Sequence, residues 1–160
     1  MSPGAPSAIA TDAKGYHALR VGAVNGGADN TAAWLSAVTN DGLQAALTTS
    51  LRNLGYLAES DASAGYVVSA QIVDLDRPWA DKVHPLLVLA PVDVSVSVRI
   101  HYVVTPARGG PAVFDDTVGT TGTATAGDSL GEDNRMRKAN EMAVKANILE
   151  FASRLHDTWR

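Results

Sequence analysis

Alternation of apolar and polar residues is clearest between residues 92 and 104. The even-numbered positions are apolar from Val92 to Val104, whereas most odd-numbered positions carry polar side chains such as Arg99 and His101. Successive side chains of a strand point to opposite faces of its sheet. The segment therefore predicts a strand with one apolar face, and it is longer than the mean strand of about five or six residues. We expect strong twist along it.

Three further segments have strand character. Residues 16–24 end in β-branched residues, and residues 66–76 keep one apolar parity as far as Ile72. The parity slips there, which indicates either a bulge or a strand leaving the core. Residues 112–126 follow the turn signal at Arg108 and are rich in threonine and glycine. Because Asp115 and Asp116 interrupt both faces of this last strand, we expect it at an exposed edge.

Two segments have helical periodicity. From residue 41, leucines recur at steps of three and four, with Asn40 or Asp41 as the expected N-cap and Gly55 as the C-terminal stop. Residues 133–159 form a longer helix with an apolar stripe. This stripe consists of Val144, Ile148, Phe151 and Leu155, widened by Ala143, Ala146 and Ala152.

The resulting order, β-α-β-β-β-α, predicts an α+β fold built as a two-layer sandwich. Two amphipathic helices can bury their stripes only on the single apolar sheet face, so both should cover the even-numbered side of residues 92–104. The first two strands are joined through a helix and should be parallel with a right-handed crossover. The last three should form an antiparallel meander. The opposite sheet face has no element left to cover it.

Composition fits one globular domain. The chain has 160 residues, of which 46% are hydrophobic and 19% charged. We expect residues 1–14, rich in Pro, Gly, Ala and Ser, to form a flexible tether and residues 15–160 to form the domain. The tether shows no basic segment followed by an apolar one, so a signal peptide and a lipidated cysteine would already have been removed.

Charge and cysteine content exclude several classes of function. The net charge of −4 provides no basic field for nucleic acid. The absence of cysteine excludes disulfides, cysteine-bound zinc and a thiol nucleophile. The apolar run at residues 85–92 is too short to span a bilayer.

Two charged residues on the central strand are candidates for a ligand site. Arg99 and His101 lie two positions apart, so they share the polar face at a spacing of about 6.6 Å. One interpretation is a site for an anionic ligand. The favoured interpretation is a solvated face on which these side chains pair with Asp or Thr of a neighbouring strand.

No motif indicates catalysis, a metal or a cofactor. The four histidines have no metal-binding spacing, and neither a phosphate-binding glycine loop nor a hydrolase nucleophile elbow is present. Asp74 with Asp76 and Asp115 with Asp116 could perform acid–base chemistry if buried, but protection of exposed strand ends is favoured. We therefore predict no enzyme, no metal and no cofactor.

Asparagine is a poor helix former, yet Asn140 and Asn147 lie seven residues apart on the apolar side of the last helix. We expect their amides to hydrogen-bond a loop or a strand where helix and sheet meet, with a ligand role as the alternative.

A loop between the second and third strands is the other candidate contact region. It carries Trp79 within the sequence RPWADKVHP, and exposed aromatic residues with arginine are common in protein contacts. The expected contact residues on this loop and on the open face are Arg77, Trp79, Leu86, Leu87, Arg99 and His101.

Three stretches together resemble a family of small alphaproteobacterial envelope lipoproteins. They are VNGGADNTAAWLSAVTNDGLQAALTTSLRNLGYLA, the strand ending in LDRP with its partner VRIHYVV, and GTATAGDSLGEDNRMRKANEMAVKANILEFASRL. The resemblance covers about residues 16–155 and is most specific in the last helix. Members are often named UDP-N-acetylglucosamine acyltransferases, but this chain shows no left-handed β-helix repeat. The cysteine that such lipoproteins acylate is absent from this sequence.

The element order is also similar to that of envelope assembly lipoproteins, such as the small lipopolysaccharide-transport partner and the amino-terminal domain of the Tol-system propeller protein. The resemblance implies a periplasmic domain tethered to the outer membrane by an N-terminal lipid. We predict a non-enzymatic module that binds another envelope protein or itself. The alternative is a carrier that holds a lipid or glycolipid between helices and sheet, and a third hypothesis is an enzyme whose site has no recognisable motif.

Overall fold

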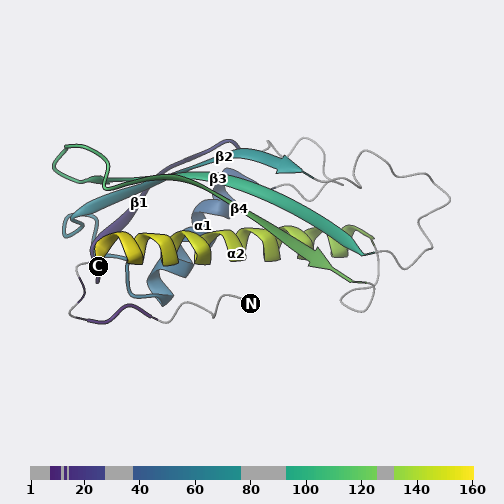
Figure 1. Ribbon diagram of the computed structural model, residues 1–160, viewed down its shortest axis with the longest axis horizontal. Helices are drawn as coiled ribbons and strands as arrows, with labels where there is room; N and C mark the ends of the chain where they lie inside the picture. Colours follow the sequence, from purple (N-terminus) through teal and green to yellow (C-terminus); the bar gives the residue numbers. More distant parts are fainter. Residues whose placement is uncertain (1–7, 12, 14, 28–37, 77–92, 126–131) are drawn as a thin grey trace.

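The computed structural model describes residues 8–11, 13, 15–27, 38–76, 93–125 and 132–160. The elements are β1 (Leu19–Asn25), α1 (Asn40–Asn53), β2 (Tyr66–Asp76), β3 (Val94–Pro106), β4 (Phe114–Ala124) and α2 (Glu132–Trp159). This order confirms the predicted α+β fold, and Figure 1 shows both helices on the same side of the sheet.

The sheet follows the predicted topology. Its strand order is β1-β2-β3-β4, with β1 parallel to β2 and both other pairs antiparallel. The register between β2 and β3 shifts between Ile72 and Asp74, so the parity slip in the sequence marks a bulge. As expected, β4 is an edge strand, and β1 is the other edge.

The core lies between the even-numbered face of β3 and the helices. Every even-numbered side chain of β3 from Val94 to Val104 is at most 3% exposed. Tyr102 stacks on Phe151 of α2 with ring centroids 4.2 Å apart. From α1, Leu43, Leu47 and Leu51 are fully buried. The two helices therefore cover this face, and among the described residues no helix covers the opposite one.

The N-cap of α1 differs from the prediction. Thr39 is the cap, and its Oγ1 accepts a hydrogen bond from the Gly42 backbone N–H at 3.0 Å. Asn40 does not cap the helix, because its Oδ1 accepts a bond from the backbone N–H of Gly27 at 2.8 Å. Gly55 follows the helix with φ of 81°, a left-handed conformation that explains the predicted stop.

Part of the segment expected to form the tether contacts the body of the domain. Ile9 is buried at 7% exposure, and its backbone N–H donates to the carbonyl of Leu54 at 2.9 Å. Ala13 packs against the core as well. Ile9, an apolar residue in an otherwise small and polar stretch, thus packs beside the end of α1.

Close contact between α2 and β4 explains the weak pattern of the last strand. A Cβ at Gly122 would collide with the backbone of Ala139 and Ala143, so glycine allows the helix to approach the strand. The Oγ1 of Thr120 donates to the carbonyl of Ala143 at 2.8 Å. Glycine and threonine thus lie on the covered face of β4, where larger apolar residues would be expected.

Candidate functional site

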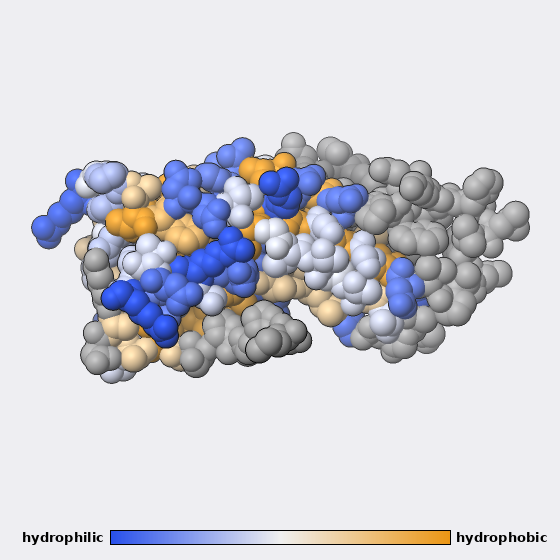
Figure 2. Space-filling view, viewed as in Figure 1, coloured by the Kyte–Doolittle hydropathy of each residue, from blue (hydrophilic) through white to orange (hydrophobic). Residues whose placement is uncertain are grey.

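The open face of the sheet is lined with short hydroxyl side chains that pair across strands. The hydroxyls of Ser95 and Thr123 lie 2.9 Å apart, and those of Ser97 and Thr121 lie 2.8 Å apart. Figure 2 shows residues of near-neutral hydropathy along β4, with hydrophilic residues gathered over the C-terminal half of α2. Because each pair shares one hydrogen bond, covering these hydroxyls costs less desolvation than covering the same hydroxyls unpaired.

His101 pairs with β4 as the favoured interpretation predicted. Its Nδ1 lies 3.1 Å from the Thr117 hydroxyl, and its Nε2 lies 3.2 Å from Asp115 Oδ1. The order hydroxyl, imidazole, carboxylate is that of a catalytic triad. However, the Asp115 side chain is 61% exposed on an open surface, so water rather than a cleft surrounds the group. A site that excludes water is what such chemistry requires.

Arg99 lies on the same face between the two neighbouring strands. It is opposite Asp74 on β2 and Gly119 on β4, and its side chain is exposed. The missing side chain at Gly119 leaves room for the aliphatic part of Arg99. Each of the two basic side chains thus has an acidic neighbour: Asp74 is paired in register with Arg99, and Asp115 contacts His101.

The other predicted contact residues, Arg77, Trp79, Leu86 and Leu87, lie outside the described residues. Trp34 lies outside them too. Trp159 is described, and it packs half-buried against Tyr56 and Tyr66 at centroid distances of 6.1 and 5.3 Å. It therefore anchors the end of α2.

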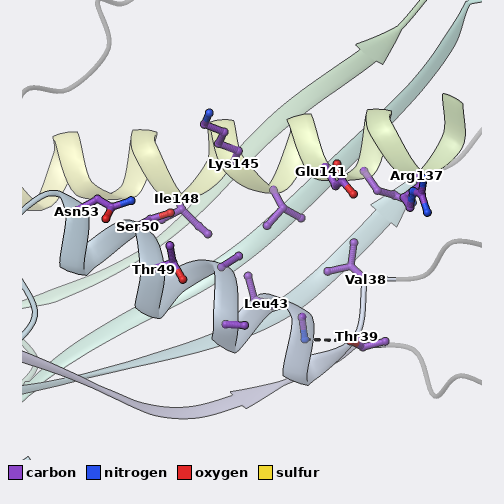
Figure 3. A pocket seen from close by; sticks show the side chains of 15 residues that line it. Val38, Thr39, Leu43, Thr49, Ser50, Asn53, Arg137, Glu141, Lys145 and Ile148 are labelled. Atoms are coloured by element: carbon purple, nitrogen blue, oxygen red, sulfur yellow. Dashed lines mark hydrogen bonds between the residues drawn. The ribbon is translucent and has the colours of Figure 1, made fainter. Parts of the chain in front are cut away.

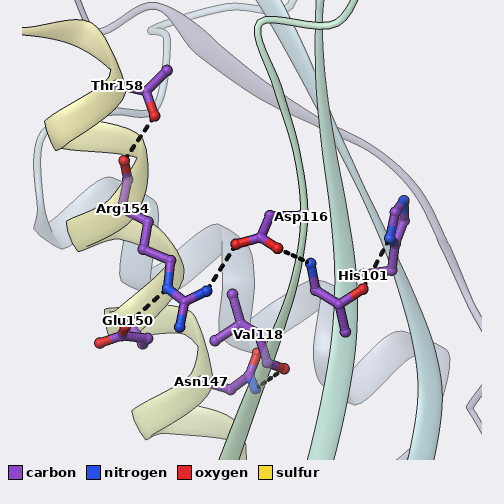
Figure 4. Close-up of polar contacts among 8 residues, drawn as sticks. His101, Asp116, Val118, Asn147, Glu150, Arg154 and Thr158 are labelled. Atoms are coloured by element: carbon purple, nitrogen blue, oxygen red, sulfur yellow. Dashed lines mark hydrogen bonds and ion pairs between the residues drawn. The ribbon is translucent and has the colours of Figure 1, made fainter.

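The adjacent carboxylates of β4 point to opposite faces. Asp116 faces α2, where Arg154 donates to it at 2.8 Å and to Glu150 at 2.9 Å (Figure 4). The hydrogen bond from Arg154 holds the pKa of Asp116 below its ordinary value of 3.8, and the backbone N–H of Thr117 acts in the same direction. Asp116 thus stays ionised at neutral pH and is unsuited to act as a general acid.

Asn147 lies at the seam between helix and sheet, as predicted. It is fully buried, and its Nδ2 donates to the carbonyl of Val118 at 2.8 Å. The Tyr102 hydroxyl donates to Asn147 Oδ1 at 2.9 Å, and burial raises the pKa of Tyr102. Asn147 therefore joins α2 to β3 and β4, which is a structural role. Asn140 is also buried, and it lines the groove between the helices.

That groove is the second candidate site. It has a volume of about 700 Å³ and lies between α1 and α2 (Figure 3). The carrier hypothesis placed a ligand between helices and sheet, whereas this groove opens between the two helices. The lining residues are Val38, Thr39, Gly42, Leu43, Ala45, Ala46, Thr49, Ser50 and Asn53 from α1 and its approach, and Arg137, Asn140, Glu141, Val144, Lys145 and Ile148 from α2.

Sequence reasoning missed this groove. The alanines that widen the apolar stripe lie on the last helix, whereas the small residues that open the groove include Ala45 and Ala46 of α1. Their spacing on the helix, next to Thr49, was the available signal. That spacing does not by itself indicate a groove, because the sequence does not show which side of α2 lies opposite α1.

Two other properties concern the described part of the chain. There, no three His, Asp or Glu side chains converge into a group that could hold a metal ion. None of the helices in that same part is long and apolar enough to cross a bilayer.

These features define a two-layer α+β domain with one open sheet face. No family model matches the sequence, and no curated protein matches it either. Several solved structures do share the fold. A candidate lipoprotein from Caulobacter crescentus CB15 has a TM-score of 0.55 at 12% identity, covering 89% of this chain and 91% of its own.

Two further structures widen the comparison. Protein XCC0632 from Xanthomonas campestris, of the DUF330 family, has a TM-score of 0.59 at 11% identity and covers 88% of this chain and 84% of its own. PelC from Paraburkholderia phytofirmans, solved as a dodecamer, has a TM-score of 0.53 at 17% identity and covers 96% and 94%. At these identities the likeness establishes the fold alone. None of the three is described by an enzymatic activity.

Proposed function

We propose that this chain is a non-enzymatic envelope lipoprotein domain that acts as a protein-interaction or assembly module. In this proposal the domain lies in the periplasm, is tethered to the outer membrane by an N-terminal lipid, and binds a second copy or another envelope protein. Arg99 and His101 belong to the contact surface, together with Arg77, Trp79, Leu86 and Leu87. The proposal is supported by two solved structures that share this fold, a candidate lipoprotein and a protein that forms a dodecamer.

The open sheet face is the observation that carries the proposal. Its hydroxyls are paired across the strands, so a partner that covers them meets fewer unpaired polar groups than on a face of isolated hydroxyls. Arg99 stands among these short side chains as the long, exposed one. An exposed planar guanidinium is well suited to bidentate pairing with a carboxylate, and arginine is enriched at the energetic centres of interfaces.

Sedimentation of the purified domain over a range of concentrations tests self-association. We expect concentration-dependent oligomers, and we expect Arg99→Glu to weaken them about tenfold or more, because it reverses the charge at the centre of the face. Arg108→Glu is the matched control, since Arg108 is an exposed arginine in the turn after β3 and off this face. Equal weakening by both variants would contradict the assignment of the face.

Cross-linking in native envelopes tests the heterologous alternative. A photoreactive side chain in place of His101 should capture a defined protein, while the same group at Arg108 should not. A monomer at every concentration, with no cross-linked product from the sheet face, would overturn the proposed function.

The groove between the helices favours a second candidate function, a carrier for a lipid or glycolipid. Its volume of about 700 Å³ falls in the range of about 300–1,000 Å³ that is typical of small-molecule sites. Displacement of a bound apolar dye by lipid extracts tests this candidate, and the absence of any dye binding would count against it.

A further inference from the structure

The base of the groove between α1 and α2 is apolar. Leu43 and Ile148 are fully buried there, and Val144 is 7% exposed. The α1 wall is built from small, uncharged side chains, including Ala45 and Thr49. The space exists because these side chains are short, and a leucine-sized residue at either position would occupy part of it.

All the charge around the groove lies on the α2 wall. Arg137, Glu141 and Lys145 follow one another at intervals of four residues, which places them on one side of the helix. Figure 3 shows all three on α2, with Glu141 and Arg137 beside the groove and the Lys145 side chain directed away from α1. Two cations and one anion give this rim a charge of +1, in a chain whose net charge is −4. The groove thus combines an apolar base with a one-sided cationic rim.

The dimensions favour a single hydrocarbon chain over a peptide helix. The α1 lining runs from Gly42 to Asn53, a rise of about 16 Å along the helix axis. One acyl chain spans half of a bilayer core of about 30 Å, or about 15 Å. A helix as long as α1 would occupy on the order of 1,600 Å³. The groove has less than half that volume, so such a helix would stand largely outside it.

We propose that this groove binds the hydrocarbon chain of a single-chain anionic amphiphile, with its carboxylate or phosphate head group beside one of the two cations, Arg137 or Lys145. The inference rests on the carrier candidate and gives it a ligand class. It does not depend on the open sheet face. The buried amide of Asn140 lies on the same wall between the two cations and adds a neutral polar group next to the head-group position.

Displacement of the neutral dye N-phenyl-1-naphthylamine measures binding to the wild-type chain. Dodecanoate and dodecanoyl lysophosphatidylglycerol, each below its micelle concentration, separate the carboxylate source from the phosphate source. Dodecanol is the uncharged probe. We expect at least one anionic probe to bind about five- to tenfold more tightly than dodecanol, since each exposed ion pair contributes modestly. Equal binding of all three would overturn the head-group assignment.

Two kinds of variant locate the site. Thr49→Trp fills the groove from an exposed helix position and should weaken binding of every probe at least about tenfold. Arg52→Trp is its control, because Arg52 is exposed on α1 and outside the groove lining. Replacing both Arg137 and Lys145 by glutamine should weaken only the anionic probes, whereas Glu141→Gln should strengthen them.

Circular dichroism and urea unfolding confirm that each variant is folded before binding is compared. Unchanged binding in Thr49→Trp would overturn the proposed site. Loss of lipid binding in that variant with unchanged sedimentation would separate the groove from assembly on the sheet face. Conversely, loss of assembly in Arg99→Glu with normal dye displacement would show that assembly on the sheet face does not depend on the groove.

Discussion

At the scale of single residues, Asn147 shows how one poor helix former can be essential to a helix. Its amide is fully buried and connects Tyr102 of β3 with Val118 of β4. A buried polar network is favourable only when every member is paired, because an unpaired buried group loses its hydration without compensation. Asn147 therefore fixes the rotation and height of α2 on the sheet more narrowly than apolar packing alone would.

We expect Asn147→Ala to reduce the free energy of unfolding by about 2–4 kcal/mol, since it leaves a cavity and an unpaired Tyr102 hydroxyl. Tyr102→Phe should cost about 1 kcal/mol. In the double variant the two costs should be less than additive, because each single change already breaks the shared hydrogen bond. Urea unfolding at neutral pH measures all three values, and strict additivity would show that the bond contributes little.

At the scale of elements, the packing of α2 onto β4 depends on a glycine. The helix backbone at Ala139 and Ala143 lies where a side chain of residue 122 would be, so the interface is closer than usual for a helix on a sheet. The Thr120 hydroxyl adds a bond to the helix carbonyl of Ala143. Together these contacts bury residues whose types alone do not indicate a core position.

We expect Gly122→Ala to destabilise the domain by about 1–3 kcal/mol or more, because the added methyl group overlaps helix backbone that cannot rotate away. Gly119→Ala is the matched control on the same strand. Its methyl group would meet Arg99 at an ordinary distance of 3.5 Å, so its effect should be within about 1 kcal/mol of zero. Thermal or urea unfolding compares the two, and similar losses in both would indicate a general cost of losing glycine from β4.

At the scale of the whole molecule, a segment that precedes the first strand covers part of the core at the end of α1. Ile9 packs beside Gly55 and donates its backbone N–H to Leu54, so the start of the described chain covers the end of α1. The cover extends the core beyond the sheet and helices. Ile9 thus packs on the domain, although it lies within the segment expected to form the tether.

We expect Ile9→Ala to lower the free energy of unfolding by about 2 kcal/mol, near the lower end of the range for a buried isoleucine because the segment is terminal. Ala10→Ser, at an exposed neighbouring position, should have almost no effect. Urea unfolding of the two variants decides whether the domain begins before residue 15. Equal stability of Ile9→Ala and wild type would place the boundary where the sequence suggested.

The sequence by itself determined the elements and their faces. Alternation in β3, helical spacing in α1 and α2, and the order of elements are encoded in neighbouring residues, so the relative directions of the strands and the open face could be predicted. The parity slip after Ile72 was compatible with either a bulge or a strand leaving the core. Only the tertiary structure decided which residues of different strands and helices lie opposite one another. The pairing of His101 with Asp115, the approach of α2 to Gly122 and the groove beside Arg137 depend on register and on the spacing of helices. Those quantities arise from packing between segments far apart in the chain, which local periodicity does not encode.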